Sequence, residues 1–380
     1  MSKIIVIGAG MVGSAIAIDM AKNHEVTLTD LSILVLKNVK TKHNELQILT
    51  LDVTDKEVLQ KTIKEFDLVI CAVPGFLGFS TLRAIIEAEK NVIDISFFSE
   101  NSLELDALAK EKNVTAIVDC GVAPGMDNVI LGHYNEIMKL TDFECLVGGL
   151  PKEKKWPFSY KAPFSPIDVI EEYTRPARYV ENGYEVVREA LTDCDYVHFD
   201  KIGTLESFNS DGLRSIIHTM SHIPNMKEKT LRYPGHVEYV RVLKESGFFN
   251  EDEIEVNGIG IRPLDFTSKI LFNEWKLEKN EEEITVMRIT LKGENAKGQT
   301  EEITYDLHDE YCQKTQTSSM SRTTGYTATA AANLFLDGLF SEKGVFPPEL
   351  VGKHEACFQY FLNYLKERNI HYIKSSKILS

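Results

Sequence analysis

The sequence predicts an α/β fold: a doubly wound parallel sheet followed by an α+β domain on a largely antiparallel sheet. Two observations in the 380 residues lead to this prediction. Short apolar strands alternate with helices from residue 3 to residue 119, starting with a glycine-rich turn, and such alternation implies a parallel sheet. Beyond residue 125 the strands become longer and more polar, which is typical of an antiparallel sheet with one solvated face. The first part is a Rossmann-type dinucleotide-binding pattern.

The first strand, 3–7, runs directly into the loop Gly8-Ala9-Gly10-Met11-Val12-Gly13. Gly8 permits a tight turn, Gly10 lets the backbone approach a pyrophosphate, and Gly13 lets the next helix pack closely on the strand. The N-terminus of that helix, expected over 14–21, then faces the phosphates. We predict that this loop, Met11 and Val12 included, contacts a dinucleotide; the alternative is a glycine turn that serves packing only.

The second strand, Val26–Thr29, is closed by Asp30, about 20 residues after the glycine loop. A carboxylate at this place can accept hydrogen bonds from the ribose hydroxyls and repels a 2′-phosphate. The next residues, Leu31-Ser32-Ile33, offer no cation that could receive such a phosphate. The sequence therefore favours NAD over NADP as the cofactor.

Further strands are expected over 46–53, 67–74, 91–95 and 115–119, with helices over 55–65 and 103–111. Residues at the ends of these strands face the cofactor in such folds. We therefore expect cofactor contacts from Asp52 after the third strand, from Val73, Pro74 and Gly75 after the fourth, and from Ser96 after the fifth. Turn capping is the alternative for Asp52, and core packing is the alternative for the neighbours of Ser96, Phe97 and Phe98.

In the second half, strands are expected over 142–149 and 284–291, helices over Thr324–Leu339 and Pro348–Arg368, and a short final element over 370–373. The segment 321–325 precedes a helix expected to begin at Tyr326. Its hydroxyls and amides could face the cofactor or substrate, or could only cap the helix.

The composition excludes several classes of protein. The 57 acidic and 42 basic residues give a net charge of −15, which repels nucleic acid and anionic membranes. The six cysteines lack metal-ligand spacing, so we expect reduced thiols and neither disulfides nor a metal site. The first strand begins at residue 3, and no apolar run approaches the ~20 residues of a membrane span. We expect a cytoplasmic protein with a small-molecule substrate and without nucleic-acid or membrane partners.

Segments along nearly the whole chain resemble the saccharopine dehydrogenase family, most closely its lysine 6-dehydrogenase branch. The segments are 74–79 (PGFLGF), 119–125 (DCGVAPG), 147–151 (VGGLP), 171–177 (EEYTRPA), 210–214 (SDGLR), 230–236 (TLRYPGH) and 319–325 (SMSRTTG). The resemblance implies a dinucleotide-binding domain of residues 1–124 plus 320–380, interrupted by a catalytic domain of residues 125–319. It also implies a homodimer formed through the central sheet.

The resemblance further implies that the segment with Thr230 and Arg232 binds an amino-acid substrate. The loop that contains Ala123 and Pro124 should lie between nicotinamide and substrate. Saccharopine reductases have an acidic residue where this chain has Ala123. This departure weakens a saccharopine assignment and favours the lysine branch.

Oxidation of lysine at its ε-carbon requires a neutral amine, whereas the free ε-amine has a pKa of about 10.4. Some group must accept the proton. Asp119 ends a strand at the expected sheet crevice and is the first candidate, with His236 the second. The alternatives are that Asp119 braces the glycine turn that follows it, and that His236 starts a helix or lies in the core.

The α-carboxylate of such a substrate calls for a guanidinium, which can bind both carboxylate oxygens. Arg232 is the first choice, with Arg214 and Arg175 as alternatives, although each could belong to a bracing ion pair. The α-ammonium could be bound by Asp211 or Glu172.

We therefore expect NAD-dependent oxidative deamination of the ε-amine of L-lysine, giving a semialdehyde that cyclises to piperideine-6-carboxylate. The nearest alternative is a saccharopine or carboxynorspermidine dehydrogenase or reductase, which joins or cleaves a larger secondary amine. An alternative of another class is a nucleotide-binding sensor without turnover.

Overall fold

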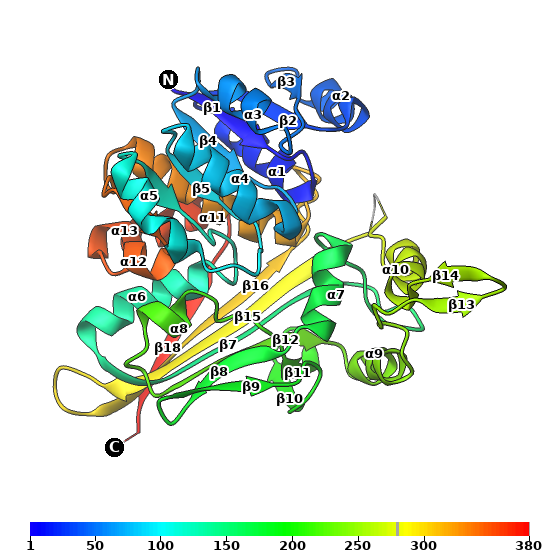
Figure 1. The fold of residues 1–380 in the computed structure, drawn as a ribbon. Helices are drawn as coiled ribbons and strands as arrows, with labels where there is room; N and C mark the ends of the chain where they lie inside the picture. Colours follow the sequence, from blue (N-terminus) through cyan, green and yellow to red (C-terminus); the bar gives the residue numbers. More distant parts are fainter. Residues whose placement is uncertain (279–280, 380) are drawn as a thin grey trace.

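The computed structural model describes residues 1–278 and 281–379 and contains two large sheets, one above the other in Figure 1. Within the described residues, the first sheet is parallel throughout, as the alternating pattern predicts. Its strands, in spatial order, are β17 (Gly344–Phe346), β6 (Thr115–Ile117), β5 (Val92–Asp94), β4 (Leu68–Cys71), β1 (Lys3–Ile7), β2 (Glu25–Asp30) and β3 (Gln47–Thr50).

Helices cover both faces of this parallel sheet, because its strands are apolar on both sides. One apolar core, with Ile5, Val69 and Leu82, lies beneath the helices between the early strands. The connecting helices are α1 (Met11–Met20), α2 (Ile33–Lys42), α3 (Lys56–Ile63), α4 (Gly75–Glu87), a 3₁₀ turn at Ser102–Leu105 and α5 (Asp106–Glu111).

The second sheet is mixed and carries the long strands that the sequence predicts around 142–149 and 284–291. Only the β12–β7 pair is parallel among its described pairings. The spatial order is β10 (Asp195–Phe199), β11 (Gly203–Asn209), β12 (Asn225–Arg232), β7 (Lys139–Pro151), β15 (Glu283–Glu294), β16 (Thr300–Glu310) and β18 (Tyr372–Ile378), with β8 (Ala177–Glu181) beside β12 and β9 (Tyr184–Arg188) beside β8.

The remaining helices surround the second sheet or join the two sheets (Figure 1). They are α6 (Met126–Ile137), α7 (Pro166–Thr174), α8 (Ile216–Thr219), α9 (His236–Glu245), α10 (Pro263–Glu274), α11 (Ser319–Leu336), α12 (Pro348–Gly352) and α13 (Glu355–Glu367). A small hairpin, β13 (Ile254–Val256) with β14 (Ile259–Ile261), projects beside α10. No helix among the described residues is both long enough and apolar enough to cross a bilayer.

A second apolar core joins the two sheets. It includes Ile4 on β1, Ala328 on α11, Ile130 on α6 and Met287 on β15, so α6 and α11 lie between the sheets and pack on both. The cavity described below is consequently held between two elements that share a core.

The C-terminal region differs from the prediction in two respects. Helix α11 begins at Ser319 rather than at Tyr326, because the Ser318 hydroxyl accepts the Ser321 N–H and caps the helix there. The segment 321–325 thus lies inside the helix. The final strand β18 is longer than the expected 370–373 element and pairs with β16 in the second sheet, whereas β17 joins the parallel sheet. The domain boundaries at residues 124 and 320 stay a prediction.

Candidate active site

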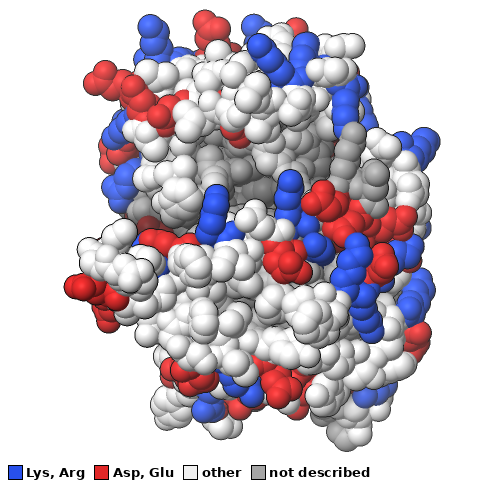
Figure 2. All heavy atoms as spheres, turned by 90° about the vertical axis from the view of Figure 1, so that its right-hand side faces the viewer, with Lys and Arg blue, Asp and Glu red and all other residues white. Residues whose placement is uncertain are grey.

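A cavity of ≈530 Å³ lies between the carboxyl ends of the parallel strands and the facing part of the second sheet. In Figure 2 the surface is hollowed between the two parts of the molecule, and both acidic and basic side chains lie along the lower edge of the hollow. The walls come from the glycine loop, the turn 72–74 after β4, the loop 121–124, helix α7 and strand β12. Ligands bind at this edge of open parallel sheets because the loops that follow the strands converge there.

The glycine loop has the geometry that a dinucleotide requires. Gly8 has φ +103° and lies under Ala72, whose carbonyl oxygen would be 2.4 Å from an added Cβ; at Gly13 an added Cβ would lie 2.0 Å from the Gly8 carbonyl oxygen. Gly10 lines the cavity, and a Cβ there would meet no protein atom within 4 Å. Such a methyl group would therefore project into the space that a pyrophosphate needs, so the loop fits the cofactor.

Asp30 also lines the cavity, at the end of β2. Its two carboxylate oxygens accept the N–H groups of Ala9, at 2.9 Å, and of Ser32, at 2.8 Å. These bonds fix the carboxylate beside the glycine loop and leave lone pairs free for ribose hydroxyls, since each oxygen can accept two bonds.

The structure brings most of the predicted cofactor contacts together. Those that line the cavity are Gly8, Gly10, Met11, Val12, Gly13, Asp30, Val73, Pro74, Ala123 and Pro124.

Three predicted cofactor contacts do not line the cavity. Asp52 is exposed and bonds the backbone and hydroxyl of Thr54, whose hydrogen bonds lower the pKa of its carboxyl, so it has the turn-capping role. Gly75 begins α4 and packs against the Phe97 carbonyl. Ser96 is buried behind the wall, where its N–H donates to Asp94. A position at the end of a strand, which is all that the sequence indicates, does not show whether a side chain faces the cavity or lies behind its wall.

Arg232 lines the cavity together with Glu172, to which its Nη2 donates at 2.7 Å. The Arg232 Nε also donates to the Tyr173 hydroxyl, at 3.1 Å, and Tyr160 lies under the guanidinium. Burial raises the pKa of Glu172 and the charge of Arg232 opposes this rise. Arg232 and Glu172 together present one positive and one negative group, which is the charge pattern that an amino-acid head group complements.

Other predicted substrate residues form bracing ion pairs. Arg175 pairs with Glu171, and both line the cavity. Asp211 lines the cavity but accepts a bidentate interaction from Arg178, at 3.0 and 2.9 Å.

Arg214 does not line the cavity, contrary to the prediction that it contacts substrate. Its guanidinium bonds Asp119, with an Nη2–Oδ1 distance of 2.8 Å, donates to the Phe98 carbonyl and lies over the Phe97 ring. Asp119 itself lines the cavity with φ +54°, directly before the glycine turn. Asp119 is thus paired with Arg214, a residue that the sequence suggests as a ligand of the substrate carboxylate.

His236 is also outside the cavity. It is buried in an aromatic cluster with Tyr173 and Trp275, where Nε2 bonds the Tyr173 hydroxyl at 2.9 Å and Nδ1 bonds the Phe158 carbonyl oxygen. Burial and the nearby charge of Arg232 lower its pKa to about 3. The imidazole is therefore neutral and holds Tyr173, which in turn holds Arg232; this is the core alternative rather than the catalytic one.

Two cavity carboxylates were missed by the sequence analysis, Asp168 on α7 and Glu228 on β12. Each has one buried oxygen to which no described residue donates a hydrogen bond, Oδ1 of Asp168 and Oε2 of Glu228. Burial raises the pKa of Asp168 to about 6. Glu228 alternates with Thr230 and Arg232 along β12, so the two-residue period of a strand could have found it.

The cavity wall favours a cation. Apart from Asp30 beside the glycine loop, its carboxylates Asp119, Glu171, Glu172 and Asp211 are each paired with an arginine, while Asp168 and Glu228 have no ion-pair partner among the described residues. Because buried charges require partners, these two carboxylates favour a substrate that carries positive charge.

Comparison with known proteins agrees with this architecture. Family models match over residues 4–117 (saccharopine dehydrogenase NADP binding domain) and 121–370 (saccharopine dehydrogenase C-terminal domain). The chain is 25% identical to saccharopine dehydrogenase [NADP(+), L-glutamate-forming] of Saccharomyces cerevisiae, over 71% of this chain and 62% of that protein. It is 23% identical to carboxyaminopropylagmatine dehydrogenase of Synechocystis, over 92% of each chain. The chain spans 29% of the mouse alpha-aminoadipic semialdehyde synthase, to which it is 26% identical over 66% of its own length.

Two solved structures have the same fold. Apo saccharopine dehydrogenase (L-Glu forming) from S. cerevisiae matches with a TM-score of 0.81 at 20% identity, over 99% of this chain and 100% of that chain. Homospermidine synthase of Legionella pneumophila, in complex with NAD, matches with a TM-score of 0.67 at 12% identity, over 99% and 91%. With family models that match both parts of the sequence, the chain belongs to the saccharopine dehydrogenase family, whose members are NAD(P)-dependent C–N oxidoreductases.

Proposed function

We propose that this protein catalyses the NAD-dependent oxidative deamination of the ε-amine of L-lysine. The product is a semialdehyde that cyclises to piperideine-6-carboxylate, with release of ammonia. When bound, NAD would accept the hydride from the amine-bearing carbon. Gly8, Gly10 and Gly13 would hold its pyrophosphate, and Asp30 its ribose hydroxyls.

The observation that carries the proposal is the row of side chains along β12. Glu228, Thr230 and Arg232 all line the cavity, since alternate residues of a strand share one face. Glu228 and Arg232 are four residues apart, so their Cα atoms are separated by about 13 Å at the rise of a strand. Extended lysine measures roughly 7–8 Å from its carboxylate carbon to its ε-nitrogen, and a hydrogen bond of about 2.8 Å at each end gives a similar span.

In this arrangement the charged residues at the two ends of the row bind the two ends of lysine. Arg232 binds the α-carboxylate and Glu172 the α-ammonium, because the two side chains already form a pair of opposite charges at 2.7 Å. The ε-amine then lies at the Glu228 end of β12. Ala123 and Pro124 line the same cavity.

A second candidate is a longer cationic substrate that contains a secondary amine. Asp168, a cavity carboxylate that forms no ion pair with a described residue, supports this alternative because it offers a place for a second cation. The Synechocystis relative named carboxyaminopropylagmatine dehydrogenase, which aligns over 92% of each chain, favours the same class. A saccharopine-type reaction belongs to this second candidate.

The test is the formation of NADH with a panel of L-lysine, L-ornithine, saccharopine and carboxynorspermidine, with ammonium measured in parallel. We expect lysine to give one ammonium for each NADH. Turnover of a secondary amine but not of lysine would establish the second candidate. No NADH with any member of the panel would leave a nucleotide-binding sensor.

Gly10→Ala is the negative control, which tests whether turnover depends on a dinucleotide bound at the glycine loop. The added methyl meets no protein atom within 4 Å, so the variant should fold normally, but it projects into the space needed by the pyrophosphate. We expect it to lose NAD binding and turnover together. The preference for NAD over NADP and the homodimer remain parts of the proposal, to be checked by cofactor titration and by light scattering.

A further inference from the structure

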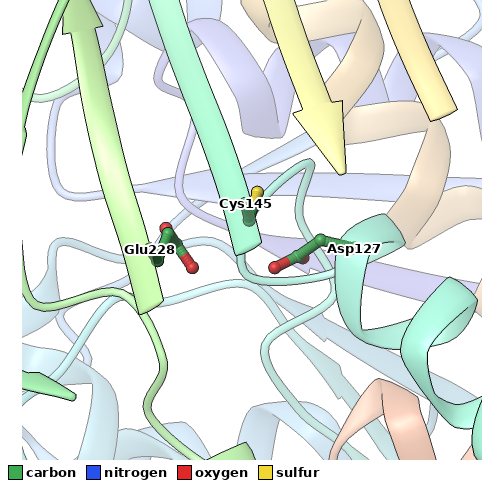
Figure 3. A group of neighbouring side chains, drawn as sticks. All are labelled: Asp127, Cys145 and Glu228. Carbon is green, nitrogen blue, oxygen red and sulfur yellow. The ribbon is translucent and has the colours of Figure 1, made fainter. Parts of the chain in front are cut away.

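Three buried groups meet directly beneath the loop 121–125. Asp127 comes from α6, Cys145 from β7 and Glu228 from β12, and one ligating atom of each lies within 4.8 Å of the others. Figure 3 shows the carboxylates of Asp127 and Glu228 pointing toward each other below the thiol of Cys145. The parallel pairing of Glu228 with Cys145 fixes the two strands at this level.

Both carboxylates have an unsatisfied oxygen. Asp127 is 0% and Glu228 4% exposed, and within residues 1–278 and 281–379 neither Asp127 Oδ2 nor Glu228 Oε2 has a hydrogen-bond partner. The other Asp127 oxygen accepts the Gly125 N–H at 2.9 Å, which ties Asp127 to the loop. Two buried carboxylates that face each other cannot both stay charged and unpaired at low cost. They require a proton or a cation between them.

Glu228 connects this group to the cavity, because it alone of the three lines the wall. Its carboxylate occupies the space over Gly212, where an added Cβ would lie 2.0 Å from Oε1. A proton that enters from a ligand in the cavity can therefore reach Glu228 first and the buried Asp127 next.

We infer that Glu228 is the residue that accepts the proton of the substrate ammonium, and that Asp127 is a positioning residue that shares this proton. This inference rests on the proposed function. In the step, one N–H bond of R–CH2–NH3⁺ breaks and an O–H bond forms on Glu228. The freed lone pair of the neutral amine becomes the second C–N bond as the carbon loses its hydride to NAD⁺. The products are R–CH=NH2⁺, NADH and a protonated Glu228. Water then adds to the iminium carbon and ammonium leaves, which gives the semialdehyde, and Glu228 loses its proton to solvent before the next substrate binds.

The surroundings support this role for Glu228 over Asp119. The Asp119 carboxylate already accepts two bonds from Arg214, whereas Glu228 has no ion-pair partner in the described part of the chain. Burial raises the pKa of Glu228 well above its usual range, and the neighbouring charges of Asp127, Glu172 and Asp211 add to the rise, with Arg214 opposing it. Burial likewise raises the pKa of Asp127, to about 7. The base is then available only in neutral to alkaline solution, where a neutral amine also becomes accessible.

The experiment compares Glu228→Gln, Asp127→Asn and a control, Glu144→Gln, over pH with the amine that the wild type oxidises. Glu144 precedes Cys145 on β7 and forms a surface ion pair with Lys227, so its replacement tests the same strands without touching the cavity. We expect Glu228→Gln to lower kcat by about 10²- to 10⁴-fold, the usual contribution of a general base, with NAD affinity retained. Asp127→Asn should move the acidic limb of the kcat/KM profile to lower pH, because it removes the neighbouring negative charge. The control should match the wild type.

A purely structural role for the two carboxylates would lower stability without moving a pH limb, so an unmoved limb in Asp127→Asn overturns the inference. A fully active Glu228→Gln overturns it while the proposed function stands. If the wild type oxidises no amine, the proposed function fails first. Infrared difference spectra provide a readout that needs no turnover: a carboxylic C=O band that persists into neutral pH and weakens in Glu228→Gln is expected. A stoichiometric metal ion in the purified protein would contradict the shared proton.

Discussion

Arg232 gives the sharpest test of how the cavity selects its substrate. We expect Arg232→Met in a Glu172→Gln background to reduce the preference for lysine over 1,5-diaminopentane, which is lysine without its carboxylate. The background is necessary because the pair is buried, with an Nη2–Oε2 distance of 2.7 Å. Removing Arg232 alone would leave an uncompensated Glu172 carboxylate, and that costs about 3–5 kcal/mol of stability.

The expected size of the effect comes from the contacts of the guanidinium. A hydrogen bond between charged groups contributes about 1.5–3 kcal/mol. Loss of about 2–3 kcal/mol for the carboxylate corresponds to roughly 30- to 150-fold in the ratio of kcat/KM values for the two amines. Glu172→Gln alone is the reference. It also removes one charge of the pair and so costs stability, but its amide oxygen can still accept the Arg232 N–H, and because it keeps Arg232 it keeps most of the discrimination.

The assay is initial-rate NADH formation with both amines, for the reference and for the double variant. The activity with 1,5-diaminopentane serves as an internal control for folding, since that substrate has no carboxylate to lose. If the double variant discriminates between the two amines as strongly as Glu172→Gln does, Arg232 does not bind the carboxylate, and the assignment of the head-group site is wrong.

Three further predictions concern the cofactor and stability. Asp30→Asn should lower NAD affinity by about ten- to a hundredfold and shrink the preference over NADP, whereas Asp52→Asn, outside the cavity, should leave both unchanged in a fluorescence titration. The pKa of His236 is about 3 in the folded protein, so the unfolded chain binds more protons than the folded protein between that value and about 6.5. Stability in urea should therefore fall as the pH is lowered from about 6.5 to about 3, and should fall less in His236→Gln. Burial raises the pKa of Asp19, but the charges and hydrogen bonds of Arg368 and Lys22 lower it by more, so the net pKa lies below the usual 3.8. The stability that this carboxylate contributes is then present above pH 3.8 and lost at more acidic pH, and Asp19→Asn should cost about 3–5 kcal/mol at pH 7.

Much of the fold could be predicted from the sequence because its signals are local. The strand that leads into Gly8, the closing Asp30 and the alternation up to residue 119 each depend on neighbours a few residues away. The predicted start of α11 at Tyr326 lies after the observed start at Ser319 because Ser319 and Thr323 have modest helix propensity. In the structure, the Thr323 hydroxyl donates back to the Ser319 carbonyl, and tertiary packing on α1 buries the segment.

The site was only partly predictable because partners come from distant parts of the chain. In the sequence Arg214 has no visible partner, yet in the structure its guanidinium pairs with Asp119, which is 95 residues away in the chain. His236 is the last residue of the family-like segment 230–236 and still points into an aromatic core. Glu228 carries no motif, and it becomes a cavity residue only through the pairing of β12 with β7. Sequence periodicity gives the face of a strand but not the element opposite that face.

The pairing of β12 with β7 makes a final prediction about substrate length. A shift of one residue would move Lys229 and Leu231 into the cavity, although Lys229 now bonds Asp195 at 3.0 Å and Leu231 lies in the core, so the register is strongly fixed. With both ends fixed, shortening one end should change the preferred amine. Glu228→Asp retracts the carboxylate by one methylene, about 1.3 Å along the chain. It should therefore lower kcat/KM for lysine and raise the ratio of homolysine to lysine turnover, while ornithine becomes poorer still. If Glu228→Asp ranks the three amines as the wild type does, the distance from Glu228 to Arg232 does not set the preferred length of the substrate.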